Sequence, residues 1–597
     1  MVEAGTLLLA NLSQTATNGA SLWGTFEAPK LPDFLGSNHK GGFPWSPYGP
    51  GSPPHLVTPH TRMTRYYEWT ISRENIAPDG VDTSVILVNG QFPGPLIEAD
   101  WGDEIQVTVH NQLSSPGEGT TVHWHGMTQQ ATPWMDGVPG VSQCPIAPGS
   151  TFVYKFTADQ YGTTWYHSHY SAQYTGGLFG PMIIHGPTHV PYDIDIGPVM
   201  LNDWWHTNYF DVIAHDLFLP PSPVLVDNNL INGKMSFNCG LTNSTCTPNA
   251  GVSKFTFEPG KTHRLRLINA GSEGMQRFSI DNHKLTIIAI DFITVAPFES
   301  DVVSIGVGQR YDVLVNGTGH PGEAYWMRSN YSQKCASISN LQPNALAAVY
   351  YPETDHDSSP NSTANPYVET DCMNEPLNKT VPFIPILPPD AAATTKEMEM
   401  NLIQNATGHL VFTLGGSTFR ANFNKPLLPL ANLPGVVKTP NNGTSNETSI
   451  YAPDSNVYDF GKHSSIRLIL TNPLTLAHPM HLHGHNVWVL AEGMGKWDGK
   501  VTNAKNPMRR DTFIINAGTP ELPAYTVIEW VADNPGVWPF HCHVTAHTSL
   551  GFMAIMLERP DLIPKRQIPK ELDHLCKSWD AWSNSNVVNT IDSGVKT

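Results

Sequence analysis

Basic residues are scarce in this chain of 597 residues, which has 34 Lys and Arg against 52 Asp and Glu and a formal charge of −18. That balance argues against nucleic acids and anionic membrane surfaces as partners. No apolar run approaches the ~18 residues of a membrane-spanning helix, so we expect no transmembrane anchor. Charged residues make up only 14 % of the chain, but 40 % are hydrophobic, which argues against disorder.

Proline is abundant, with 51 residues. This density excludes helical bundles and coiled coils, because each interior proline removes a backbone hydrogen bond. Three alternating segments that each end in Asn resemble one another, at 105–111, 265–269 and 466–472. Their recurrence predicts three copies of one β domain, and short strands bounded by Gly and Pro favour Greek-key barrels or sandwiches over β–α–β units.

The expected organisation is therefore all-β, with three domains, an N-terminal extension and a C-terminal tail. Length alone allows roughly three to five domains. We predict a loosely ordered extension over 1–62, β domains over 63–190, 191–352 and 401–560, a linker rich in Pro, Asn, Asp and Ser over 353–400, and a tail over 561–597.

Beyond the first residues of the chain, eight Asn-x-Ser/Thr glycosylation sequons, several of them in polar loops, favour export from the cell. The N-terminus is less clear, because Leu7–Ala10 is too short for the apolar core of a signal peptide and Glu3 stands where a basic residue is expected. Either a signal lies upstream of this start or export is unconventional. The sequons begin at Asn243, Asn316, Asn330, Asn361, Asn378, Asn405, Asn442 and Asn446.

Ten of the 26 histidines lie in four short segments. Residues i and i+2 of a strand share a face about 6.6 Å apart, so their imidazoles can reach two neighbouring metal ions but not chelate one comfortably. One such pair would more often be solvated or part of a core. Four pairs, two in the first repeat and two in the third, indicate a metal cluster, and the middle repeat is then a spacer. The segments are His123-Trp-His125, His167-Ser-His169, His478-Pro-Met-His481-Leu-His483 and His541-Cys542-His543 followed by His547.

Cys542 lies between two of these histidines. Strand alternation places His541 and His543 on one face and Cys542 on the other. Cys542 with His478 and His547 is the trigonal ligand set of a blue-copper electron-transfer site. Cys542 could instead be a buried apolar residue or half of a disulfide, but the chain has seven cysteines, and an odd count favours a thiolate ligand. Zinc is the competing metal, although it needs no second site coupled through one strand.

These four segments resemble the copper signatures of multicopper oxidases, and the resemblance extends from about residue 64 to the C-terminus. Residues 89–95 (Asn-Gly-Gln-Phe-Pro-Gly-Pro), 135–145 and 165–170 are similar to ascomycete fungal laccases in particular. So is Asp592-Ser-Gly-Val595, which resembles the C-terminal plug of that subfamily, although Lys596 and Thr597 follow it here. The resemblance implies three cupredoxin-like domains and four copper ions.

The resemblance also implies a role for each ligand. Electrons would pass from Cys542 through the backbone to His541 and His543, while His485 falls outside the ligand pattern. The implied ligands are His478, Cys542 and His547 for type 1 copper, His123 and His481 for type 2, His125, His167 and His543 for one type 3 ion, and His169, His483 and His541 for the other.

Three further residues gain an interpretation from the family pattern. Phe552 resembles the residue at the axial position of type 1 copper, where a non-coordinating side chain is expected to raise the potential, although a register shift would bring in Met553. Asp136 resembles the acid that relays protons for O2 reduction, or else it is an Asp-Gly turn residue. Glu273 resembles the acid that accepts a phenolic proton, or else it is a solvated loop residue.

The remaining cysteines are expected to pair. The family pattern implies Cys144–Cys576 and Cys335–Cys372 disulfides, and Cys239 is close enough in sequence to Cys246 for a local bridge.

The resulting hypothesis is a secreted, monomeric laccase, in which four one-electron oxidations of phenols or aromatic amines are coupled to reduction of O2 to water. Alternatives are a ferroxidase, an ascorbate oxidase-like enzyme, a phenol oxidase of pigment synthesis, or a copper-storage or structural glycoprotein. Retention of all eleven ligand positions speaks against storage.

Overall fold

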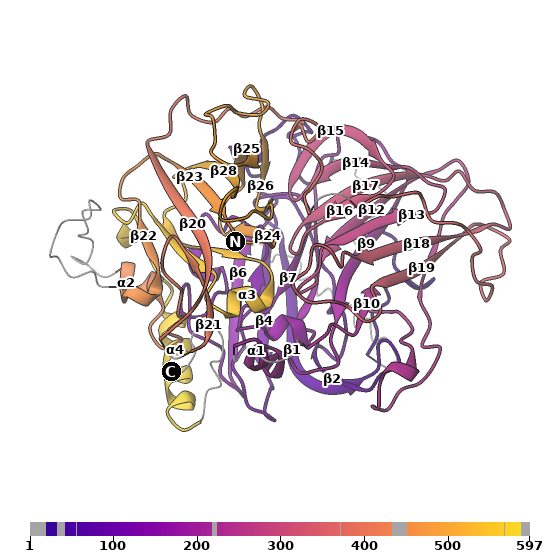
Figure 1. Cartoon of the computed structure of the whole chain (residues 1–597), viewed down its shortest axis with the longest axis horizontal. Coiled ribbons are helices and arrows are strands. Elements are labelled where there is room, and N and C mark those ends of the chain that lie inside the picture. The colour runs from indigo at the N-terminus through magenta and orange to yellow at the C-terminus, as the bar shows by residue number, and fades with distance from the viewer. Residues whose placement is uncertain are drawn as a thin grey trace, which may run out of the picture.

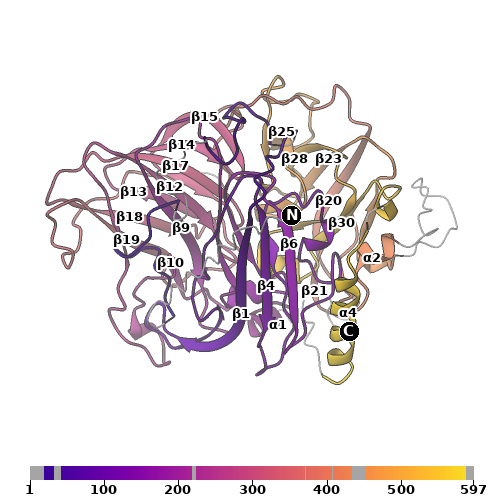
Figure 2. The same ribbon diagram turned by 180° about the vertical axis from the view of Figure 1, so that it is seen from behind.

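The computed structural model describes residues 19–586 except 33–41, 55, 218–223, 370–371, 407, 433–450 and 566. The sequons at Asn442 and Asn446 and the motif 592–595 lie outside the described residues. Three β domains, each of two sheets, make up the molecule, as the sequence predicts. In both Figure 1 and Figure 2 the second and third domains lie on either side of the first.

The first domain has two four-stranded sheets, in the orders β2-β1-β4-β6 and β3-β8-β7-β5. Its strands are β1 (Thr64–Ile76), β2 (Thr83–Val88), β3 (Ile97–Asp100), β4 (Glu104–Asn111), β5 (His123–Trp124), β6 (Thr151–Thr157), β7 (Gly162–His167) and β8 (Phe179–His185).

The second domain has sheets in the orders β10-β9-β12-β17-β14-β15 and β11-β19-β18-β13-β16. Its strands are β9 (Ile194–Trp204), β10 (Asn228–Ile231), β11 (Ser253–Thr256), β12 (Thr262–Asn269), β13 (Gln276–Ile280), β14 (Leu285–Ile290), β15 (Ile293–Ser300), β16 (Val303–Ile305), β17 (Arg310–Asn316), β18 (Ala324–Tyr331) and β19 (Asn344–Tyr350).

The third domain has sheets in the orders β21-β20-β23-β28-β25-β26 and β22-β30-β29-β24-β27. Its first strand begins at residue 394, inside the predicted linker, because that strand pairs in parallel with β23. Its strands are β20 (Thr394–Gln404), β21 (Leu410–Leu414), β22 (Val457–Asp459), β23 (Ser465–Asn472), β24 (His478–Leu482), β25 (Val487–Met494), β26 (Met508–Arg510), β27 (Thr512–Ile515), β28 (Ala524–Val531), β29 (Gly536–Cys542) and β30 (Met553–Glu558).

The three segments that ended in Asn occupy the same place in each domain. Strands β4, β12 and β23 each run parallel to one neighbour (β1, β9, β20) and antiparallel to the other (β6, β17, β28). The terminal amides of Asn111, Asn269 and Asn472 each donate to two backbone carbonyls and accept the amide of the residue two positions on. Each Asn thus satisfies buried backbone groups where the chain leaves its strand, which explains why the pattern recurs.

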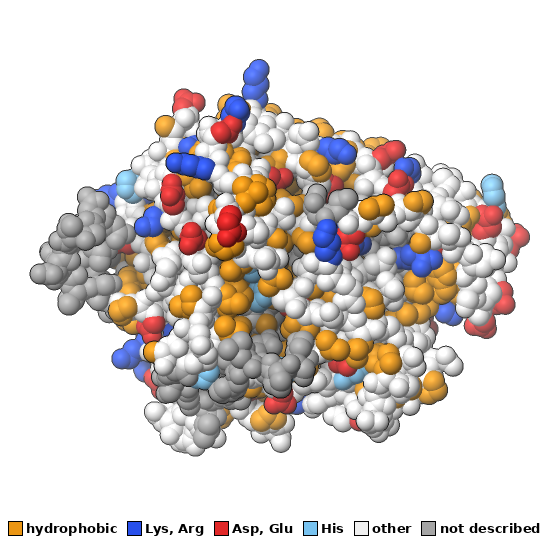
Figure 3. All heavy atoms as spheres, in the orientation of Figure 1, with side chains coloured by type: hydrophobic (Ala, Val, Ile, Leu, Met, Phe, Trp, Pro, Cys, Tyr) orange, Lys and Arg blue, Asp and Glu red, His pale blue; other side chains and the backbone are white. Residues whose placement is uncertain are grey.

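Helices are few among the described residues. They are α1 (Tyr209–Leu217), α2 (Leu427–Ala431), α3 (Thr545–Ser549) and α4 (Lys570–Ser583), and Pro133–Met135 is one of several short 3₁₀ turns. Within the described ranges, no helix has the length and apolar character needed to cross a membrane. On the face shown in Figure 3, the described Lys and Arg side chains are scattered among acidic ones rather than gathered in a patch.

Three disulfides join Cys144 to Cys576, Cys239 to Cys246 and Cys335 to Cys372, and Cys542 is the free cysteine of the chain. The first bond ties α4 of the tail to the first domain, where Trp579 is fully buried. In the N-terminal extension, Trp23 and Trp45 are also buried, so its described parts pack on the domains.

Candidate metal centres

Short strands from two domains bring the predicted histidines together. In the first domain β5 pairs with β7, which places His123 directly opposite His167. In the third domain β24 pairs with β29, which places His481 opposite His541. The side chains from the two domains then meet in one cluster, in which all rings but the half-buried His169 are buried. Its members are His123, His125, His167, His169, His481, His483, His541 and His543.

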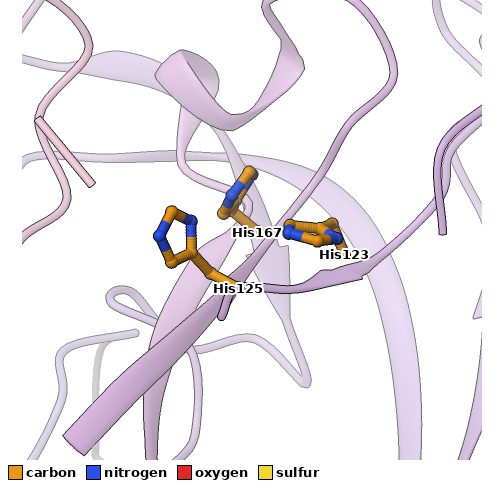
Figure 4. Close-up of side chains that lie close together, drawn as sticks. All are labelled: His123, His125 and His167. Atoms are coloured by element: carbon orange, nitrogen blue, oxygen red, sulfur yellow. The ribbon is translucent and has the colours of Figure 1, made fainter. Parts of the chain in front are cut away.

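Rings from the two domains contact each other in pairs. The ring centroids are 4.0 Å apart for His123 and His483 and 4.0 Å for His125 and His481. His543 Nε2 is 3.2 Å from His125 Nδ1. Figure 4 shows the first-domain rings of His123, His125 and His167 lying near one another, and their ligand nitrogens lie within 4.8 Å. Neither domain supplies this cluster alone.

Hydrogen bonds fix the outer nitrogens of several rings and leave the inner ones without protein partners. Nδ1 of His123, His167 and His481 lies 2.7, 3.0 and 2.9 Å from the carbonyl oxygens of Asp136, Ser168 and Asp511. The Nε2 atoms of the same three histidines are buried and have no hydrogen-bond partner. Buried polar atoms are nearly always satisfied, and ligand histidines typically use the second nitrogen for such an orienting contact. The cluster therefore fits metal ions at the Nε2 side.

Several histidines belong to more than one group of side chains that could hold a metal ion. Sets of ligand atoms within 4.8 Å are formed by His123 with His481 and His483, by His169 with His483 and His541, and by His125 with His481 and Asp511. The second is the ligand set expected for one type 3 copper. Because His123, His125, His481 and His483 each belong to two sets, the cluster is one continuous site for several ions rather than a row of separate sites.

Burial favours the neutral imidazole, which is the form that binds metal. It lowers the pKa of His541 to about 4. Burial, followed by the neighbouring rings, also lowers the pKa of His481 and His543 well below its ordinary value. These three histidines therefore stay unprotonated in weak acid.

A second site, called the thiol site below, is centred on Cys542 at the end of β29. Its Sγ lies 3.7 Å from His478 Nδ1, on β24, and 3.6 Å from His547 Nδ1, in α3. All three residues are buried. Burial raises the pKa of the Cys542 thiol and lowers that of His547 to about 3, so metal binding here would displace a proton from sulfur. The donor set fits copper, since one thiolate and two imidazoles converge on one point.

Phe552 closes this second site. It is fully buried, its ring stacks on Phe412 at 4.7 Å, and its centroid lies 4.9 Å from that of His478. Met553 instead lines a small cavity with His169, on the other side of the strand. The register with Phe552 at the thiol site is therefore the one that the fold adopts.

Asp136 lies inside the histidine cluster and also in an Asp-Gly turn. Its carboxylate is 2.9 Å from His483 Nδ1 and 3.3 Å from His123 Nδ1. Gly137 follows with a φ of +79°, and a Cβ there would be 1.8 Å from the carbonyl oxygen of Val122. Only glycine allows this close approach, which directs Asp136 at the two rings.

Glu273 is buried rather than solvated, at 4 % exposure. Its Oε1 accepts the backbone amides of Ser337 and Ile338 at 2.7 and 3.1 Å, and it accepts the Ser337 hydroxyl as well. That hydroxyl lies 3.4 Å from His547 Nε2. Ser337 thus links the carboxylate to a histidine of the thiol site.

Asp511 is the functional residue that the sequence interpretation missed. Its carboxylate is 3.2 Å from His125 Nε2, and it forms a two-point ion pair with the buried guanidinium of Arg310 at 2.7 and 2.6 Å. The sequence does hint that this region has a special role, because residues 508–515 place an Arg-Arg-Asp run in an otherwise largely apolar strand region. Because the partners come from three domains, the sequence does not say what that run contacts.

The fold and the two sites together define a copper-dependent redox enzyme. Sequence models described as multicopper oxidase match residues 70–189, 195–353 and 423–562. The chain belongs to the multicopper oxidase family.

Similar proteins include ascomycete laccases. Laccase-2 of Botryotinia fuckeliana is 35 % identical over 92 % of this chain and 92 % of that protein. Dihydrogeodin oxidase of Aspergillus terreus is 32 % identical over 91 % of this chain and 90 % of that protein. The crystal structure of the laccase from Botrytis aclada is 32 % identical, with a TM-score of 0.82 over 92 % of this chain and 98 % of that one.

Proposed function

We propose that the protein is a secreted, monomeric laccase, which oxidises phenols or aromatic amines and reduces O2 to water. The observation that carries this is the position of Cys542, whose thiol faces one site while the adjacent His541 and His543 face the other. The similarity to laccases of Botryotinia and Botrytis supports the same assignment. The three disulfides and the sequons support export.

Four copper ions are proposed, one held by His478, Cys542 and His547 and three by the cluster. The clustered ions are type 2 on His123 and His481, and two type 3 ions on His125, His167 and His543 and on His169, His483 and His541. Bound copper would supply one-electron chemistry, taking electrons singly from the substrate and delivering four to O2. The unpartnered Nε2 atoms of His123 and His481 support this use of the cluster.

The chain's own residues would carry the electrons and protons. One covalent segment, His541-Cys542-His543, links the two sites, so an electron need not cross solvent. Asp136, between His123 and His483, can hold a proton beside the cluster and pass it on as O2 is reduced. Glu273 can accept the phenolic proton as the electron leaves towards His547. The Ser337 hydroxyl contacts both Glu273 and His547, so the proton acceptor lies close to the histidine that receives the electron.

Oxygen uptake with a panel of phenols, aromatic amines, ascorbate and Fe(II) tests this function. A laccase is expected to consume O2 with several phenols and amines. Uptake with Fe(II) or ascorbate and none with phenols would contradict the proposal and favour the other enzymes of the family.

A phenol oxidase dedicated to one biosynthetic substrate is the second candidate. The relative named dihydrogeodin oxidase is about as similar as the laccases, and Glu273 is almost fully enclosed. The same panel separates the two, since a dedicated oxidase accepts a narrow set of phenols.

Glu273→Gln is expected to lower kcat/KM for phenols by about 10²-fold, a typical loss for a general base. Oxidation of ferrocyanide, which releases no proton, should be unaffected. Steady-state oxygen uptake with both donors measures this split, and Glu521→Gln in an exposed turn is the control. An equal loss with ferrocyanide would show that Glu273 supports the site's structure instead.

Phe552→Met is expected to lower the potential of the thiol-site copper, because a thioether can coordinate weakly where a phenyl ring cannot. A redox titration that follows the blue absorption measures it. Met553→Leu is a volume-conserving control on the other side of the strand and should leave the potential unchanged. A changed potential in Met553→Leu together with an unchanged one in Phe552→Met would show that Met553, and not Phe552, faces the copper.

A further inference from the structure

A separate cavity of about 230 Å³ lies where the three domains and the N-terminal extension meet. Its apolar lining includes Val57 of the extension, Phe292 of the second domain, Ile386 of the linker, and Trp488 and Trp530 of the third domain. In Figure 1 and Figure 2, β15 and β25, which both contribute to this lining, lie near the upper edge of the molecule. The proposed copper sites and Glu273 are not part of this lining.

One charged side chain in the lining is buried without a counter-ion. Arg509, on β26, is 5 % exposed. It lies opposite Trp488 in the antiparallel pair of β25 and β26, so both side chains project from the same face of the sheet. Its Nη2 donates to the Ile384 carbonyl at 2.8 Å, while Nε and Nη1 have no hydrogen-bond partner. Within the described ranges, no carboxylate forms an ion pair with it.

Two neighbouring buried arginines, unlike Arg509, each have a carboxylate partner. Arg510 pairs with Asp291 at 3.1 Å, and Arg310 pairs with Asp511 at 2.6 Å. Burial lowers the pKa of Arg509 to about 10, whereas acidic partners offset the cost of burial at the other two. A guanidinium remains charged at neutral pH, and a buried charge without a partner is strongly unfavourable. The N–H groups of the two unpartnered nitrogens therefore call for an anion.

The chemistry of the cavity narrows the choice of anion. The unpartnered Nε and Nη1 lie on different edges of the guanidinium, and either edge can donate charge-assisted hydrogen bonds to a carboxylate. The tryptophan rings and Ile386 offer aromatic and apolar surface, and His485, which also lines the cavity, already faces Glu558 at 3.1 Å. A volume of about 230 Å³ is below the ~300–1,000 Å³ of sites for drug-sized ligands, which favours a compound of one ring.

We propose that this cavity binds a small aromatic carboxylate, whose charged end is held by Arg509 and whose ring packs on Trp488 and the surrounding apolar side chains. The proposal makes no use of the copper sites or of the proposed substrate. Two acids also line the cavity, of which Asp533 is exposed, while burial raises the pKa of Asp159 to about 6. Weak acid, in which Asp159 is protonated, therefore suits the binding of an anion.

Benzoate is the probe, because it has the required charge and shape and no oxidisable hydroxyl. Equilibrium dialysis of the copper-loaded enzyme against radiolabelled benzoate, at about pH 5 where a carboxylate is still charged, is expected to show one saturable site per chain. Arg509→Met should weaken binding by about tenfold or more, since it removes charge-assisted hydrogen bonds. Benzamide, which has the same shape without the charge, should bind as weakly to the parent protein as benzoate does to the variant.

Arg467→Met is the matched control. Arg467 belongs to the same domain, lies outside the cavity and pairs with Glu529 at 2.6 Å. That variant should keep the benzoate affinity. Ile386→Trp is a second test of the cavity. The larger side chain fills the cavity from a half-buried position and leaves Arg509 in place, so benzoate binding should be abolished.

Four results would overturn the proposal. They are no saturable benzoate binding to the parent protein, equal affinity in Arg509→Met, equal affinity for benzamide, or unchanged affinity in Ile386→Trp. Because Ile386→Trp tests the cavity without touching the arginine, the outcome does not depend on the folding of Arg509→Met.

Discussion

Cys542→Ser is expected to abolish the blue colour of the enzyme and to lower phenol oxidation by more than about 100-fold. Loss of an outer contact to a metal ligand alone costs about 10–100-fold, and this change removes the ligand itself. The reason is geometric, because Sγ of Cys542 is the atom on which His478 and His547 converge. Absorption spectra, copper analysis and oxygen uptake measure the three consequences.

The same variant tests whether the two sites are separate. The histidine cluster lies on the opposite face of β29, so it should retain its copper, and the content should fall from four ions to three. Met556→Leu, a volume-conserving change at a buried position of β30, is the control and should keep colour and rate. Persistence of the blue absorption in Cys542→Ser would refute the assignment of the thiolate site.

Asp511→Ala is expected to destabilise the folded protein by about 3–5 kcal/mol, the usual cost of breaking a buried ion pair. Arg310, which is fully buried, would lose its two-point partner and keep only the carboxylate of Asp291, at 3.3 Å. The contact to His125 would also be lost, so copper should be held more weakly in the cluster. Urea denaturation followed by circular dichroism measures the stability, and metal analysis after dialysis measures the retention.

Asp498→Ala is the matched control for this change. Asp498 also forms an ion pair, with Lys500 at 2.7 Å, but both side chains are largely exposed. Solvent screens such pairs, so no measurable loss of stability or copper is expected. A denaturation midpoint for Asp511→Ala equal to that of the control would show that Arg310 does not depend on Asp511.

The histidine pairs and the repeated Asn could be found from the sequence because their chemistry is local. Two imidazoles two residues apart on a strand define a spacing, and Asn111 bonds only to residues within its own domain. The contacts of Asp511 could not be found, because it meets Arg310 and His125, which are 201 and 386 residues away in sequence. The sequence alone predicts Glu273 to be a solvated loop residue, whereas in the fold the backbone of Ser337 and Ile338 packs over it and buries it.

The division of the histidine cluster between the first and third domains also bears on how the enzyme is made. His123 and His483 contact one another across a separation that spans the whole second domain. During synthesis the first four ligands emerge long before the last four. Until the third domain has folded and docked, each nascent half presents an incomplete coordination shell that cannot hold its ions tightly. The complete cluster therefore forms only once the third domain has docked, and a chain truncated before β29 would lack both His541 and His543.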